Sequence, residues 1–135
     1  DSHYALVLSE LGYWAEARRR IERSLAAEPR NAFAAHSMAH LQYETGEPEA
    51  SIAFLREWLS HYPRDGAFRG HLSWHLALVL LGEGRVEEGF ALYEDAFAAD
   101  DYPGPKVVKL MDAASYLWRA ELAGHPRDHA RWRAV

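Results

Sequence analysis

The residues best suited to chemistry are two pairs of histidines. His36 and His40 form the first pair and His71 and His75 the second, and the partners in each pair are four positions apart. Residues at this spacing lie on one face of a helix, about one turn from each other. Asp112 is an acidic residue in an apolar segment further along the chain. Imidazole and carboxylate groups can bind Zn²⁺ or another divalent ion, or act as general acid and base.

Three interpretations of these residues are open. In the first, the histidines hydrogen-bond between packed helices and complete the core, and Asp112 satisfies one of them. In the second, they line a groove that binds a peptide or a small ligand. In the third, they hold a metal ion or act in catalysis, and the metal candidates are His36, His40, His71, His75 and Asp112. The structural interpretation is favoured, because no HExxH or similar motif supports the third.

The elements that must position these residues are predicted to be pairs of helices. Apolar residues recur at helical spacing, and proline or glycine interrupts them at regular points. Each of four glycines follows an apolar helical segment and predicts a tight turn: Gly12, Gly46, Gly84 and Gly124. The pattern predicts helices over residues 1–11, 14–27, 32–45, 48–62, 67–81, 86–98 and 105–123, and a last helix that starts at Pro126.

Local signals add detail to these helices. Asn31 and Asp65 are suited to cap the helices that follow them. The run from 70 to 81 is the most apolar stretch and predicts a central helix packed on both sides. Trp74 lies between two histidines in this run and could also contact a ligand. Packing in the core is predicted for four tryptophans at apolar positions: Trp14, Trp58, Trp74 and Trp118.

Composition limits the classes of function. Of the 135 residues, 49% are hydrophobic and 26% charged, and the net charge is −5 with the eight histidines counted as neutral. The one basic cluster, Arg18-Arg19-Arg20 with Arg23, is interrupted by Glu16 and Glu22 and is interpreted as the solvated face of a helix rather than a nucleic-acid site. The longest apolar run is too short to span a bilayer. It has no cysteine, which excludes disulfides and thiolate ligands. Since no signal peptide is visible, a cytoplasmic location is expected.

The helix pairs recur with a period near 34 residues. Gly12 and Gly46 are 34 positions apart, as are Pro29 and Pro63. Residues 1–135 are therefore predicted to form a single array of about three and a half repeats, with units of about 1–30, 31–64, 65–103 and 104–135. The first unit resembles the tetratricopeptide repeat through Leu11-Gly12-Tyr13-Trp14-Ala15-Glu16-Ala17, and then Ile21, Ser24, Leu25 and Pro29. This resemblance implies an all-α, superhelical array of antiparallel helix pairs.

A closer resemblance covers residues 31–123. It rests on His36-Ser37-Met38-Ala39-His40, then His71-x-x-Trp74-His75-Leu76-Ala77-Leu78, then Leu110-Met111-Asp112-Ala113-Ala114-Ser115-x-Leu117-Trp118-Arg119. This series is similar to the tetratricopeptide repeat protein 38 family, whose chains are longer and mostly helical. Residues 1–135 are expected to be a piece of a longer array, truncated at both ends, because the sequence begins inside a first helix without a Met and stops within its last helix. The longer chains of this family fit that expectation. The open apolar ends of such a piece would favour self-association.

In such an array the first helices of successive units lie side by side and line the concave surface. The expected groove comprises His36, His40, Tyr43, His71, Trp74, His75 and Asp112. The leading prediction is a module that binds an extended protein or peptide, or a small ligand, on this face. The alternative is a metal-dependent or acid–base enzyme that uses the His and Asp cluster, and it is less expected than binding. Nucleic acid and membrane are not expected partners, and no cofactor is expected apart from a divalent metal in this alternative.

Overall fold

The computed structural model describes residues 2–135, and these residues are all-α. Helices make up 74% of the described residues, which contain no strand. This confirms the predicted all-α class, whereas the superhelical array of repeats stays a prediction. None of the helices described is long and apolar enough to cross a lipid bilayer. The chain divides into two compact units, which we call unit 1 (Asp1–Tyr62) and unit 2 (Pro63–Val135).

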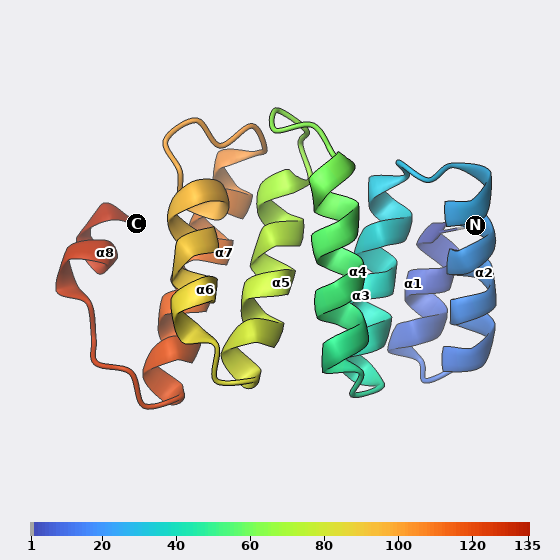
Figure 1. Ribbon diagram of the computed structural model, residues 1–135, viewed down its shortest axis with the longest axis horizontal. Helices are drawn as coiled ribbons and strands as arrows, with labels where there is room; N and C mark the ends of the chain where they lie inside the picture. Colours follow the sequence, from blue (N-terminus) through green and yellow to red (C-terminus); the bar gives the residue numbers. More distant parts are fainter. Residues whose placement is uncertain (1) are drawn as a thin grey trace. The chain divides into compact units, whose positions relative to one another are not determined.

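Unit 1 contains four helices, which Figure 1 draws from blue to green. They are α1 (Ser2–Glu10), α2 (Trp14–Ala27), α3 (Ala32–Glu44) and α4 (Pro48–His61). Helix α1 packs against α2 and α3, and α3 also packs against α2 and α4. The core between the first three helices is formed by apolar side chains at helical spacing: Ala5, Leu8, Ala17, Ile21, Met38 and Leu41.

Unit 2 contains the remaining elements. They are α5 (Arg69–Gly82), α6 (Val86–Leu92), the π-helical segment η1 (Tyr93–Phe97), α7 (Lys106–Leu122) and α8 (His129–Ala134). Helix α5 packs against α6, η1 and α7, so the most apolar run of the sequence is the central element of this unit. In Figure 1, α5, α6 and α7 run in alternating directions. The core holds three aromatic rings from η1 and α7: Tyr93, Phe97 and Tyr116.

The predicted turns and one of the predicted caps are confirmed. Gly12, Gly46, Gly84 and Gly124 all have positive φ, between 68° and 93°, a conformation that side chains with a Cβ rarely adopt. Asn31 caps α3, because its side chain accepts a hydrogen bond from the backbone N–H of Ala34 at 3.0 Å. The helix boundaries of unit 1 lie within one residue of those predicted. Local sequence signals were therefore sufficient to place these elements.

Several predictions about helix ends in unit 2 are wrong. Asp65 caps no helix, since α5 begins only at Arg69 and has no side-chain cap. The last helix begins at His129 rather than Pro126, because the Asp128 side chain accepts hydrogen bonds from two backbone N–H groups there. The predicted helix over 86–98 changes after Leu92 into a π-turn, in which the Ala98 N–H donates to the Tyr93 carbonyl at 2.9 Å. This wider turn accompanies the burial of three of its side chains.

Two of the four tryptophans do not pack in the core as predicted. Trp14 is 46% exposed and Trp118 is 54% exposed. Trp14 is the first residue of α2, directly after a turn, so its side chain lies at the end of the helix. In α7 the inward face is formed by Ala113, Tyr116, Leu117 and Ala120. Trp118 is turned about 200° from Tyr116 along this helix, which places it on the outer side.

Candidate functional site

One polar contact among the candidate residues joins His71 on α5 to Asp112 on α7. The Nδ1 atom of His71 lies 2.9 Å from a carboxylate oxygen of Asp112. Asp112 is only 4% exposed. Burial, the larger effect, raises the pKa of the Asp112 carboxyl above its usual value, whereas the hydrogen bond from His71 and the charge of that ring lower it. An ionised carboxylate only accepts, so it requires His71 to donate from Nδ1.

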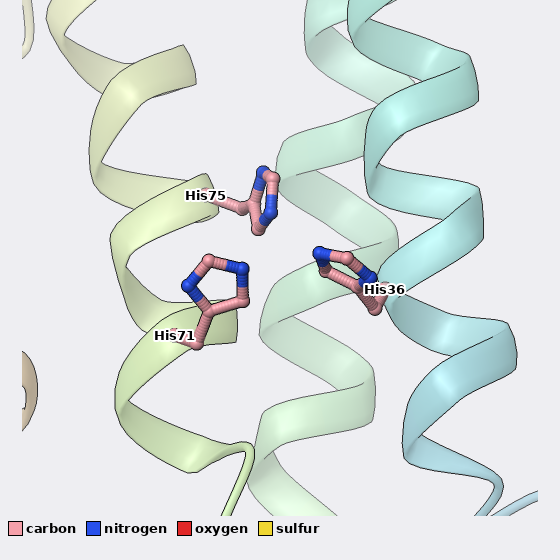
Figure 2. Close-up of side chains that lie close together, drawn as sticks. All are labelled: His36, His71 and His75. Carbon is pink, nitrogen blue, oxygen red and sulfur yellow. The ribbon is translucent and has the colours of Figure 1, made fainter. Parts of the chain in front are cut away.

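His75 lies one turn further along α5. Its ring is 8% exposed, and the ring centroids of His71 and His75 are 4.8 Å apart with the rings at 79°. Figure 2 shows both side chains leaving the same side of α5. Trp74 stacks on His71 with centroids 5.2 Å apart and an angle of 16°, and its ring meets His75 edge-on at 4.8 Å. The indole therefore restricts the positions that the two imidazoles can adopt.

Arg119 also belongs to this group, although the sequence analysis gave it no role. Its guanidinium carbon is 6.0 Å from the centre of the Trp74 ring, and the side chain bonds to Ser115 within α7. Arg119 is seven residues after Asp112, and this spacing places both on one face of a helix. The sequence contains this signal, but it becomes informative only once Asp112 is known to face α5.

The space around Asp112 is closed by Tyr102, which lies in the loop before α7. Tyr102 is 5% exposed, and burial together with the charge of Asp112 raises the pKa of its phenol to about 12. The ring packs directly against the backbone of Gly70. A Cβ atom at position 70 would overlap this ring, with its Cδ2 atom at 2.7 Å. Gly70 therefore permits the close packing beside His71.

The other predicted site residues lie in unit 1. On α3 the Nε2 atoms of His36 and His40 are 3.0 Å apart, so one ring donates a hydrogen bond to the other. The Nδ1 atom of His40 lies 3.5 Å from a carboxylate oxygen of Glu10, whose side chain is 57% exposed. Figure 2 labels His36 on α3. Tyr43 is 61% exposed near the end of this helix.

The predicted site residues thus form two groups, one in each unit. Unit 1 holds His36, His40 and Tyr43, and unit 2 holds Trp74 with the His71–Asp112 pair and His75. The hypothesis that all of them line one groove stays a prediction. Within unit 2 the arrangement suits two kinds of chemistry, since an imidazole oriented by a buried carboxylate can bind a metal ion or accept a proton.

Comparison with known proteins does not assign the chain to a family. No protein-family model matches it, and no solved structure is significantly similar to it. The resemblance to tetratricopeptide repeats therefore stays a prediction from the sequence.

Proposed function

We propose that the chain is a protein-interaction module of the tetratricopeptide-repeat kind, which binds a peptide segment of a partner on the α5–α7 face of unit 2. The observation that carries this proposal is an exposed apolar stripe on α7. Its members are between 54% and 70% exposed: Val107, Met111, Trp118 and Leu122. Their spacing of four, seven and four residues places them along one side of the helix. Exposed apolar surface of this extent is typical of interaction sites.

The stripe is about 22 Å long, because fifteen residues of helix rise about 1.5 Å each. An extended peptide of roughly seven residues has the same length. Trp118 is the best candidate for an energetic hot spot, since tryptophan contributes strongly when a partner covers it.

Arg119 indicates the polar chemistry of the partner. It is exposed beside the stripe, bonds to Ser115 within its own helix and lies over Trp74. A guanidinium has five donors and can accept a carboxylate in a bidentate arrangement. The expected partner is thus an extended segment that carries apolar side chains and at least one Asp or Glu.

Selection from a random peptide library displayed on phage tests this proposal. The bait is the whole chain, and binding of each selected peptide is then measured by fluorescence anisotropy. We expect the peptides to contain apolar residues with an acidic residue, and to bind Trp118→Ser at least ~10-fold more weakly. Arg119→Gln should weaken the binding of acidic peptides more than the binding of the same peptides with Asn or Gln in place of Asp or Glu. Tyr13→Ser is the matched control, because Tyr13 is 62% exposed in unit 1.

Two results would contradict the proposal. In one, the selected peptides bind Trp118→Ser as tightly as they bind the unmodified chain. In the other, sedimentation velocity shows a dimer that Trp118→Ser dissociates, which would assign this face to a second copy of the chain.

A metal-dependent or acid–base enzyme is the second candidate function. The observation that favours it is the hydrogen bond between His71 and the buried Asp112, which resembles the way carboxylates orient catalytic imidazoles. A direct test of this candidate is screening for hydrolysis of chromogenic ester and phosphate substrates, with and without added Zn²⁺. Activity that His71→Gln abolishes would favour the enzyme over the interaction module.

A further inference from the structure

We propose that unit 2 carries a binding site for a small organic carboxylate, whose apolar body fills a cavity between η1, α7 and α8 while Lys106 and Lys109 attract its charge. This inference goes beyond peptide binding, because the ligand is a small molecule. The side of α7 that lines the cavity and the exposed stripe proposed for a peptide are about 140° apart around the helix axis, at about 100° per residue. The two sites can therefore hold or fail independently.

The cavity has a volume of about 450 Å³, and all the residues that line it belong to unit 2. This volume lies in the range of about 300–1,000 Å³ that is typical of sites for small molecules. Apolar side chains form part of its wall: Tyr93, Ala98, Leu110 and Ala113. Leu110 is 48% exposed, so apolar surface is accessible to a ligand. The body of the ligand is therefore expected to be apolar.

The cavity is also lined by the only two lysines in the sequence, Lys106 and Lys109. They are three positions apart at the start of α7, so they are neighbours on one face of the helix. Within residues 2–135, no ion pair or side-chain hydrogen bond joins either ammonium group to another residue. Helix α7 has no side-chain cap, and the positive end of its dipole adds to the attraction for an anion.

Two acidic residues of the cavity limit the charge of the ligand. Glu94 is paired with Arg131, whose Nε donates to its carboxylate at 2.8 Å. Asp100 is exposed and has no ion-pair partner in the part of the chain that the structure describes. The two ammonium groups thus exceed the one unpaired carboxylate by a single positive charge. A ligand with one negative charge, such as a carboxylate, matches this balance.

Tyr93 provides an independent indication of a ligand. It lines the cavity but is only 3% exposed, and among the described residues its hydroxyl has no hydrogen-bond partner. A buried phenol normally has one. Phe97 and Tyr116 hold its ring, with centroids 5.4 and 6.2 Å away. Burial raises the pKa of Tyr93, so the hydroxyl is protonated at neutral pH and can donate to a carboxylate.

Calorimetric titration of the whole chain with 2-naphthoate and with octanoate tests the proposal. We expect at least one of them to bind with a stoichiometry of one, and its neutral alcohol, 2-naphthalenemethanol or 1-octanol, to bind at least ~10-fold more weakly. Tyr93→Phe keeps the ring and removes the hydroxyl. It should weaken binding of the acid roughly 10-fold, and it should not lower the thermal unfolding temperature, because the hydroxyl has no partner to lose.

Charge variants test the role of the lysines. Replacing both Lys106 and Lys109 by glutamine should weaken binding of the acid roughly 10-fold. Arg133→Gln is the matched control, because it removes an exposed positive charge of α8 that does not line the cavity. Trp118→Ser should also leave this binding unchanged, which separates the cavity from the stripe on α7.

A second measurement needs no substitution. Carbon-13 at the Cε atoms of lysine gives two signals in this chain, one from each lysine, and both should shift when the acid is added but not when the alcohol is added. The proposal is overturned if neither acid binds, or if the alcohols bind as tightly as the acids. It is also overturned if an acid binds while the lysine signals stay in place, or if both Tyr93→Phe and the double lysine variant bind it as tightly as the unmodified chain.

Discussion

Replacing Gly89 by alanine should destabilise unit 2, although the same change in most helices is stabilising. Gly89 is a buried residue of α6. A Cβ atom there would overlap the hydroxyl oxygen of Tyr116, with Cζ of that ring at 2.9 Å and the carbonyl oxygen of Ala77 at 3.4 Å. Tyr116 is fully buried, so the overlap cannot be relieved by movement into solvent.

The magnitude follows from two opposing effects. Alanine in place of glycine in a helix stabilises by about 0.4–1 kcal/mol, because it restricts the unfolded chain. Inserting an atom into a packed core costs about 1–3 kcal/mol. The higher part of this range applies, because the Tyr116 ring has Phe90 and Phe97 at centroid distances of 5.3 and 5.5 Å and cannot shift alone. We expect a net loss of about 2 kcal/mol.

Urea unfolding followed by circular dichroism measures this change. Gly82→Ala is the matched control, since a Cβ at Gly82 meets nothing within 4 Å, and it should be neutral or slightly stabilising. In a Tyr116→Phe background the nearest overlapping atom is absent, so the cost of Gly89→Ala should fall by about 1 kcal/mol. The reasoning is refuted if Gly89→Ala stabilises the chain as Gly82→Ala does, or if its cost is the same in both backgrounds.

Three further predictions concern a helix cap, two tyrosines and a close contact. Asn31→Ala removes the acceptor for the Ala34 N–H and should lower the free energy of unfolding by about 1 kcal/mol in the same urea assay. Asn31→Asp keeps a side-chain oxygen acceptor and should retain most of the stability that the cap contributes. Burial raises the pKa of both Tyr102 and Tyr116 to about 12 from an ordinary value of 10.0. Between these pH values the folded chain therefore keeps phenol protons that the unfolded chain releases. The free energy of unfolding should fall as the pH rises from about 10 towards 12. Ultraviolet titration of the folded chain should show these two phenols ionising last. Gly70→Ala places a Cβ against the Tyr102 ring, and thermal unfolding should show a loss of about 1–3 kcal/mol.

The sequence alone determined the helices of unit 1, the glycine turns and the cap at Asn31. These features depend on residues within one or two turns of each other. Apolar spacing sets the buried side of a helix, positive φ at the turns favours glycine, and a cap needs a side-chain oxygen at one position. Asp65 and Pro126 carried similar signals but did not start helices. Helix α5 begins at Arg69 without a side-chain cap, and the Asp128 side chain caps the start of α8.

The tertiary structure alone decided which polar and aromatic residues meet. His71 and Asp112 are 41 positions apart, and whether they touch depends on how α5 and α7 are rotated about their axes. A shift of one residue turns a side chain by about 100°, enough to exchange the buried Asp112 for the exposed Met111. The same rotation leaves Trp118 exposed and brings Arg119 over Trp74. Helical spacing shows that residues share a face, but only packing decides what that face meets.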